Sequence, residues 1–268
     1  MEPTPNKDPN RKTYPQVTGI GRDEHVGMVR EIFATITGRY DFLNRLLSLR
    51  RDVSWRRFAV RKMRFFETFR LLDVATGTAD LAIEAARRHP GIQVAGVDFV
   101  REMLAAGRPK IAGRGLAGRI SLLQADAMNL PFPDGSFDAV GIAFGIRNMP
   151  DRLRALREMN RVLVPGGRVF VLEMNFPRNR LWQGFFDLYL NRLLPCVARL
   201  FSGNPEAYRY LTDSILHFPA PHAFLEMMEE AGFRNPEQYS LTFGITCLYV
   251  GGKEGPEVPA ASATNSLT

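Results

Sequence analysis

The sequence predicts an α/β fold with a mostly parallel sheet, because short apolar runs alternate along the chain with amphipathic helical patterns. The apolar runs that predict strands cover residues 70–74, 93–97, 120–124, 139–144 and 169–174. Helical patterns lie between them at residues 80–88, 102–108 and 152–162. The runs are apolar at successive positions, which is typical of strands that helices cover on both faces.

The segment before the first strand predicts added helices. Apolar residues recur at spacings of three and four from Val29 to Leu47, and the pattern is interrupted near Gly38. This spacing predicts one amphipathic helix or a pair of helices. Residues 1–24 and 254–268 lack such periodicity, so we expect a disordered leader and a disordered tail there.

The C-terminal third has a different pattern. A long apolar helix is expected at residues 181–201 and a further helix at residues 223–231. Two last strands, at residues 238–241 and 246–250, are expected to form an antiparallel hairpin around Phe243 and Gly244. With the five earlier strands they predict a sheet of seven strands that ends in an antiparallel pair.

Composition excludes several classes of protein. Of the 268 residues, 45% are hydrophobic and 24% are charged, as in a soluble globular domain. No apolar run approaches the roughly 18 residues that span a bilayer. The cysteines, Cys196 and Cys247, lie far apart and show no metal-ligand spacing. We therefore expect a cytoplasmic protein without a bound metal.

The net charge of +7 indicates anionic partners, and the excess is concentrated between Arg45 and Arg70. In that stretch seven further basic residues face only Asp52 and Glu67: six arginines between residues 50 and 64, and Lys62. The segment is interpreted as a solvated helix face, a membrane-surface element or an RNA contact. No recognition module for nucleic acid is visible, so we expect no nucleic-acid partner.

The first chemical signal is the stretch LLDVATGTAD at residues 71–80. Small residues such as Gly77 and Thr78 after a buried strand let a ligand approach the backbone. The stretch lacks the G-x-G-x-x-G pattern of a dinucleotide site, because Ala79 stands where a second glycine is expected. Asp73 and Asp80 would repel a diphosphate, so an uncharged or cationic ligand is favoured.

Two further signals follow the next strands. Asp98 ends the second strand, where an acidic side chain accepts hydrogen bonds from the two hydroxyls of a ribose. Asp126 is expected to end the third strand, followed by Ala127 with its backbone N–H available. That pair reads an adenine by accepting from its amine and donating to a ring nitrogen. Residues 164–168, VPGGR, predict a tight turn.

Taken in order, these motifs resemble the class I S-adenosylmethionine-dependent methyltransferases over residues 69–175. More narrowly, the chain from Val29 to Gly252 resembles the ubiquinone/menaquinone-biosynthesis C-methyltransferase family. The stretches that carry this likeness are FATITGRYDFLNRLLSLRRDVSWRR at 33–57, FGIRNMPDRLRALREMNRVLVPGGR at 144–168, LEMNFPRN at 172–179 and AYRYLTDSI at 207–215.

The resemblance implies a Rossmann-like class I methyltransferase domain over residues 25–253. Residues 25–68 would be a helical substrate or lid element, residues 69–175 the cofactor core, and residues 176–253 the substrate-side helices and last strands. The cofactor would be S-adenosylmethionine. Its implied contacts are Asp73, Gly77, Thr78, Asp98, Met103, Asp126, Ala127 and Ala143.

The chain departs from the family at two places. Ala79 replaces the glycine that commonly completes the loop after Thr78, and this bears on the affinity for the cofactor. Arg50 and Arg51 stand where the family often has glycine and a different polar pattern, and this bears on the head group of the substrate.

The resemblance further implies C-methylation of a reduced polyprenyl quinone, demethylmenaquinol to menaquinol. Arg147, Asn148 and Tyr40 are the implied catalytic residues, with Arg147 as the cation that favours a deprotonated ring hydroxyl. Whether the proton leaves through water, Tyr40 or Tyr208 stays open. The residues implied to bind the substrate are Tyr40, Asn44, Trp55, Arg147 and Tyr208. None of the four histidines, His25, His89, His217 and His222, is expected at the strand ends.

The apolar helix at residues 181–201 has several interpretations. The alternatives are a groove for a polyprenyl tail, an interfacial helix, a part of the core and the seam of a homodimer. Peripheral contact with the inner face of the membrane is one hypothesis that follows. Two other functions stay open: methylation of another small phenolic or lipid substrate, and a non-catalytic scaffold that binds the cofactor, which Ala79 motivates.

Overall fold

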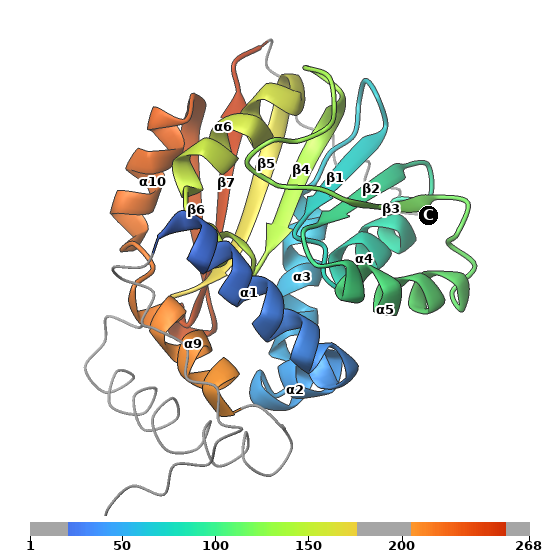
Figure 1. Ribbon diagram of the computed structural model, residues 1–268. Helices are drawn as coiled ribbons and strands as arrows, with labels where there is room; N and C mark the ends of the chain where they lie inside the picture. Colours follow the sequence, from blue (N-terminus) through green and yellow to red (C-terminus); the bar gives the residue numbers. More distant parts are fainter. Residues whose placement is uncertain (1–20, 176–204, 256–268) are drawn as a thin grey trace, which may run out of the picture.

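A computed structural model describes residues 21–175 and 205–255, which form a seven-stranded sheet between two layers of helices (Figure 1). The strand order is β3-β2-β1-β4-β5-β7-β6, with β7 antiparallel to both neighbours and the other pairs parallel. The predicted sheet, its antiparallel end and the Rossmann-like class are confirmed. The strands are β1 Arg70–Val74, β2 Gln93–Asp98, β3 Ile120–Gln124, β4 Phe137–Ala143, β5 Leu163–Met174, β6 Phe233–Leu241 and β7 Thr246–Lys253.

The helices bound the sheet on both faces and add a cluster at one end. They are α1 Arg22–Ile36, α2 Tyr40–Leu47, α3 Arg51–Lys62, α4 Asp80–Arg88, α5 Arg101–Ala112, α6 Arg152–Val162, α9 Pro205–Leu216 and α10 Pro221–Glu230. Short 3-10 turns lie at η1 Thr37–Arg39, η2 Ile146–Asn148 and η4 Thr242–Gly244. Predicted helices and strands at residues 70–74, 80–88, 120–124 and 152–162 have the observed bounds.

Successive residues of the central strands pack into different cores, which is why the sequence shows continuous apolar runs. Leu72 faces a core with α6 and α10, whereas Leu71 faces a second core with α3 and α4. In β5, Val169 and Val171 enter the first core, and Phe170 enters the second. Side chains of a strand alternate between faces, so both layers of helices are anchored by the same strands.

One expected turn is instead a bulge inside a strand. The prediction of a tight turn at residues 164–168 is wrong, because β5 already pairs with β4 at Leu163, opposite Phe137. Pairing resumes at Arg168, opposite Ala139, so the residues between form extra backbone within the ladder. Gly166 has a φ of 80°, which a glycine adopts without strain.

The N-terminal helices lie over one end of the sheet. α1 begins at Arg22, inside the range expected to be leader, and ends where the predicted interruption near Gly38 is observed as η1. α1 runs across the ends of the parallel strands (Figure 1). A third core joins α1 and α2 to α9 through Met28, Ile32, Leu43, Tyr210 and Ile215. The helix expected at residues 181–201 lies outside the described residues, as do residues 1–20 and 256–268.

Asp138, at the start of β4, holds the segment that leads into β1. It is 1% exposed, and its Oδ1 accepts from the backbone N–H of Glu67 at 2.9 Å. Its Oδ2 accepts from the Thr68 hydroxyl at 2.9 Å and from the Arg70 N–H at 3.3 Å. One buried carboxylate thus satisfies several backbone donors of the segment that connects α3 to β1.

Replacement of this carboxylate is expected to destabilise the protein strongly. Asp138→Ala should lower the free energy of unfolding by about 3 kcal/mol, because it leaves several buried N–H groups without acceptors. Urea denaturation measures the change. Asp134→Ala is the matched control, since the Asp134 side chain is 78% exposed in its pair with Arg161 and should change stability by less than about 1 kcal/mol. Equal losses in both variants would contradict the anchoring role.

Candidate functional site

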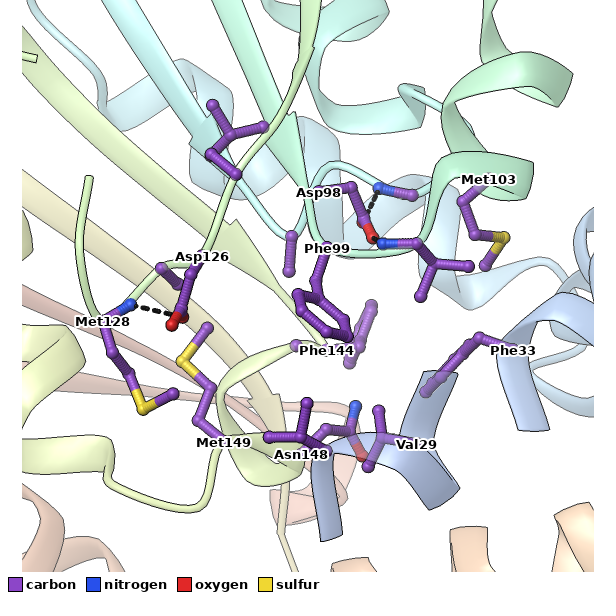
Figure 2. A pocket seen from close by; sticks show the side chains of 18 of the residues that line it. Val29, Phe33, Asp98, Phe99, Met103, Asp126, Met128, Phe144, Asn148 and Met149 are labelled. Atoms are coloured by element: carbon purple, nitrogen blue, oxygen red, sulfur yellow. Dashed lines mark hydrogen bonds between the residues drawn. The ribbon is translucent and has the colours of Figure 1, made fainter. Parts of the chain in front are cut away.

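A pocket with a cavity volume of about 130 Å³ opens beyond the carboxyl ends of β1, β2 and β4 (Figure 2). The chain runs from β1 to β2 on one side and returns to β4 on the other, and such reversals in strand order are where α/β sheets bind ligands. Its lining comprises Val26, Val29, Phe33, Tyr40, Ala75, Gly77, Val97, Asp98, Phe99, Val100, Met103, Ala125, Asp126, Ala127, Met128, Ala143, Phe144, Gly145, Asn148, Met149 and Pro150.

The loop after β1 is tightly coiled at the base of the pocket. Ala75, Gly77 and Ala79 have φ values of 49°, 56° and 68°. Ala79 therefore occupies a left-handed position that favours glycine, and it is followed by Asp80 as the first residue of α4, without a side-chain cap. Strained backbone of this kind persists where surrounding contacts hold it.

Asp73 supplies those contacts from below. It is 1% exposed, and its Oδ2 accepts from the Thr76 hydroxyl at 2.6 Å and from the Ala82 N–H at 3.1 Å. Burial raises the pKa of the Asp73 carboxyl from 3.8 to about 7, against the hydrogen bonds that lower it. Asp73 does not line the pocket, so it shapes the loop from behind.

Gly145, after β4, lets the two loops meet. A Cβ at this position would lie 2.6 Å from the Cβ of Ala75, closer than two carbon atoms pack. The absence of a side chain at Gly145 therefore sets how near the β4 loop approaches the β1 loop. Sequence reasoning missed this residue.

Asp98, at the end of β2, faces the pocket. Its Oδ2 accepts from the Gly77 N–H at 2.7 Å and its Oδ1 from the Val100 N–H at 2.8 Å (Figure 2). Burial raises the pKa of Asp98, while these backbone donors act to lower it. The carboxylate thus ties the β1 loop to the loop after β2.

Asp126 lies on the opposite wall of the pocket (Figure 2). β3 ends at Gln124, so Asp126 follows the strand by two residues instead of ending it. It lies in a turn, where its Oδ1 accepts from the Met128 N–H at 2.9 Å. Asp98 and Asp126 are the only charged side chains among the described residues that line the pocket.

The N-terminal helices close the pocket from above. Val29 and Phe33 project from α1 toward Asp98 and Met103 (Figure 2). The Phe33 ring meets the Tyr40 ring edge-on with centroids 6.0 Å apart. Burial raises the pKa of the Tyr40 phenol, and a hydrogen bond with Asn44 opposes this. Asn44 therefore contacts Tyr40 and does not itself line the pocket.

A cluster around Lys110 fastens α2 to the β1 loop. The Lys110 Nζ lies 2.5 Å from Asp41 of α2 and 2.6 Å from Asp80 of α4. The Thr78 hydroxyl donates to Asp41 at 2.6 Å, so Thr78 faces this cluster and does not line the pocket. Burial favours a higher pKa for Asp80, but Arg56 and Lys110 outweigh it and lower the pKa. The cluster explains why Tyr40 is held beside the loop.

Trp55 supports the pocket from behind Phe144. Their ring centroids lie 6.0 Å apart, and the Arg56 guanidinium lies 5.4 Å from the Phe144 centroid. Trp55 is 6% exposed, and its Nε1 donates to Thr242 at 2.8 Å. Phe144 itself lines the pocket with a φ of 61°. Trp55 thus positions Phe144 and does not line the pocket.

Arg147, in η2, is buried. Its Nη1 lies 2.6 Å from Glu173 Oε1, and Glu173 is fully buried. Among the described residues the Arg147 Nε has no hydrogen-bond partner. Arg147 does not line the pocket.

Asn148 lines the pocket and is held from two helices. Its backbone oxygen lies 3.1 Å from His25 Nε2 of α1, and its Oδ1 accepts from the Tyr210 hydroxyl of α9 at 3.1 Å. The expectation that no histidine lies near the strand ends is wrong for His25, because α1 folds back over them. Burial lowers the pKa of His25. Tyr208 lies on α9, and its side chain is outside the described residues.

The pocket brings together residues from five segments of the sequence. The predicted site residues that line it are Tyr40, Gly77, Asp98, Met103, Asp126, Ala127, Ala143 and Asn148. The predicted residues placed behind its walls are Asp73, Thr78, Asn44, Trp55 and Arg147. Sequence reasoning missed the α1 side chains Val26, Val29 and Phe33, although their helical spacing was visible.

Residues 21–175 and 205–255 lack two features that would change the interpretation of the site. No three His, Cys, Asp or Glu side chains in these ranges group closely enough to hold a metal ion. No helix there has the length and apolar character needed to cross a bilayer.

The profile of the ubiE/COQ5 methyltransferase family matches residues 20–253. The ubiquinone/menaquinone biosynthesis C-methyltransferase UbiE of Geobacter sulfurreducens is 49% identical over 84% of this chain and 88% of its own length. The demethylmenaquinone methyltransferase of Thermus thermophilus is 48% identical over 83% of this chain and 100% of its own. A putative methyltransferase solved with the Haloferax volcanii activator Trm112 shares the fold, with a TM-score of 0.60, 20% identity and coverage of 83% and 97%.

The contact between Gly145 and Ala75 predicts a reciprocal pair of variants. Gly145→Ala should lower the free energy of unfolding by about 1–3 kcal/mol, because its Cβ collides with that of Ala75. Ala75→Gly in the same chain should recover most of the loss, since it removes the opposing methyl group and relieves a left-handed alanine. Urea denaturation of the four chains measures the coupling. Additive effects of the two substitutions would contradict the contact.

The raised pKa of Asp73 predicts a pH-dependent cost to stability. The folded protein favours the protonated carboxyl, so the stability that this group contributes is complete below 3.8 and is lost as the pH rises toward 7. Asp73→Asn should remove this loss, which reaches up to about 4 kcal/mol. Denaturation of both chains from pH 4 to pH 8, at spacings of about one pH unit, measures it. A constant difference between the two chains over this range would contradict the prediction.

Proposed function

The chain belongs to the ubiE/COQ5 methyltransferase family, and on that premise we propose that its pocket binds S-adenosylmethionine beside a polyprenyl quinol ring. The protein is an S-adenosylmethionine-dependent C-methyltransferase of quinone biosynthesis. The relatives named demethylmenaquinone methyltransferase support demethylmenaquinol as the substrate and menaquinol as the product. The observation that carries the proposal is an apolar pocket whose charged lining is two carboxylates.

The residues of the pocket fit a cationic nucleoside ligand. Asp98 and Asp126 are the charged side chains in the described lining, and such a surface attracts a positive sulfonium and repels a diphosphate. Asp98 would accept from the ribose hydroxyls, and Asp126 with Ala127 would read the adenine. Met103 and the Gly77 loop would enclose the remainder. Thr78 and Asp73 would act through the shape of that loop, and Ala143 would border the transferred group.

S-adenosylmethionine supplies an electrophilic methyl group on a positively charged sulfur when it is bound. The chain has to place a ring carbon in line with that group and exclude water. Phe33, Phe144 and Met149 give the pocket apolar walls suited to an aromatic ring. Trp55 behind Phe144, and Asn44 behind Tyr40, would hold those walls in place.

A quinol ring carbon becomes nucleophilic when a neighbouring hydroxyl loses its proton. Arg147 would favour that anion, because a buried cation stabilises nearby negative charge. Its Nε is the donor left over from the pairing with Glu173. Asn148 and Tyr40 line the pocket and would orient the hydroxyl. Its proton would leave through a water, because burial keeps the Tyr40 phenol protonated. Tyr208 on α9 is retained as a contact to the substrate.

The polyprenyl tail of this substrate dissolves in lipid. We therefore propose peripheral contact with the inner face of the cytoplasmic membrane, so that the ring enters the pocket while the tail stays in the bilayer. The alternative to membrane contact is that an exposed apolar face forms the interface between two copies of the chain in a homodimer.

The first test incubates the purified protein with S-adenosylmethionine and chemically reduced demethylmenaquinone that carries a short tail. Mass spectrometry of the quinone fraction should show the gain of one methyl group on a ring carbon. Asp98→Asn should weaken binding of S-adenosylmethionine by about tenfold or more, because it weakens an acceptor for two hydroxyls. Binding without any turnover would favour the scaffold, and turnover only of other phenols would favour a different substrate.

Arg147 is tested with its partner replaced at the same time. Arg147→Ala alone leaves Glu173 buried and unpaired, which costs about 3–5 kcal/mol of stability. Arg147→Met with Glu173→Gln removes both charges and should fold, yet lower kcat by about 100-fold or more. Glu173→Gln alone is the control: it also leaves a buried charge without its ion pair, so kcat is compared per folded molecule, and it should fall less because the cation is kept. Equal kcat values in these two chains would contradict the role of Arg147.

A further inference from the structure

The outer side of α2 and the turn after it expose apolar side chains in a row. Phe42 is 53% exposed, Leu46 is 36% exposed and Leu49 is 81% exposed. Phe42 and Leu46 lie about one helical turn apart on α2, and Leu49 lies in the turn that follows the helix. Apolar side chains that are exposed next to one another, with Leu49 the most exposed, are the kind of surface that binds a partner or a membrane.

The turn between α2 and α3 holds Leu49 in this exposed position. Leu49 and Arg50 have φ values of 50° and 61°, a conformation that favours glycine. Backbone bonds fasten the turn, because the Arg50 N–H donates to the Arg45 oxygen at 2.7 Å and the Arg51 N–H to the Ser48 oxygen at 2.9 Å. The two exposed cations Arg50 and Arg51 thus follow directly after the exposed Leu49.

The acidic residues of this segment are turned away from the outer surface. Asp41 pairs with Lys110 beside the β1 loop. Asp52 is 3% exposed and pairs with Arg56 at 2.6 Å. The surface formed by Phe42, Leu46, Leu49, Arg50 and Arg51, here called the α2 face, is therefore apolar with a cationic border.

The α2 face adjoins the pocket through the same helix. Tyr40, in the first turn of α2, lines the pocket, and Leu43 packs into the core with α1 and α9. α2 lies at the end of the molecule where α1 crosses the sheet (Figure 1). One side of this short helix thus borders the pocket, while the other presents apolar and cationic side chains to the exterior.

We propose that the α2 face docks the protein on an anionic lipid bilayer, with Leu46 and Leu49 inserted among the acyl chains and Arg50 and Arg51 at the phosphates. Apolar insertion with a cationic border is how interfacial helices bind membranes that contain anionic lipids. This inference rests on the proposed function and deepens it. It places the pocket beside the lipid in which a polyprenyl quinol is dissolved.

Vesicle flotation tests the proposal with the full chain. The wild type should bind vesicles of phosphatidylcholine with phosphatidylglycerol more strongly than vesicles of phosphatidylcholine alone, and added salt should weaken the binding. Leu46→Glu with Leu49→Glu should weaken binding by about tenfold or more. Arg50→Gln with Arg51→Gln should abolish the preference for phosphatidylglycerol.

Matched controls lie elsewhere on the surface. Leu123 on β3 is 47% exposed, and Arg108 on α5 is exposed. Leu123→Glu and Arg108→Gln change the same kinds of side chain and should leave vesicle binding unchanged. Circular dichroism of each variant confirms that it is folded.

Activity separates failure of this inference from failure of the proposed function. Leu46→Glu with Leu49→Glu should methylate a short-tailed quinol in detergent-free buffer as fast as the wild type, but a long-tailed quinol in vesicles at least about tenfold more slowly. No methylation by the wild type in either setting would overturn the proposed function. Methylation of the short-tailed quinol, with vesicle binding that the variants do not alter, would overturn the docking face. Loss of a sedimenting dimer in Leu46→Glu with Leu49→Glu would likewise overturn it and assign this face to a second copy.

Discussion

The hydrogen bond from the Gly77 N–H to the Asp98 carboxylate joins the loop after β1 to the end of β2, and the form of the pocket depends on it. Left-handed residues around Gly77 turn its N–H inward, where burial requires an acceptor. Behind this loop, the buried Asp73 carboxylate accepts hydrogen bonds in the same way, from the Thr76 hydroxyl and the Ala82 N–H. Both carboxylates therefore have a structural task before any ligand arrives. A ligand that also uses Asp98 binds to a loop that is already placed.

The parts of the fold that depend on local patterns were predictable. Four elements have the expected bounds: β1, β3, α4 and α6. Each is a short segment whose apolar residues follow one spacing and stop abruptly at both ends. Asp98 and Asp126 were also found, since parallel strands bring their carboxyl ends to one edge. The bulge in β5 could not be predicted. It stays within the strand because β5 pairs with β4 on both sides of it, and the sequence of residues 164–168 does not show this pairing.

Contacts across long stretches of sequence account for the rest of the site. Thr78 was expected at the cofactor, but its hydroxyl is taken by Asp41, 37 residues earlier. The charge on Arg147 could be read from the sequence, whereas its pairing with Glu173 could not, because only the fold sets β5 beside η2. His25 reaches Asn148 over 123 residues for the same reason. Periodicity marked α1 as amphipathic without indicating that its apolar side would cover a pocket.

The core that joins α1 and α2 to α9 makes the two ends of the described chain depend on each other. On the ribosome, α1 and α2 emerge first, β1 to β5 follow, and α9 is synthesised after them but before β6 and β7. Until Tyr210 appears, neither the Asn148 side chain nor the core beneath Met28 and Ile32 has its partner. The loops that border the pocket after β1, β2, β3 and β4 are thus made before the helix that completes the core with α1 and α2. In a nascent chain, Asn148 and the α1 side of the pocket therefore gain their α9 contacts only after the loops beyond β1 to β4 have been made.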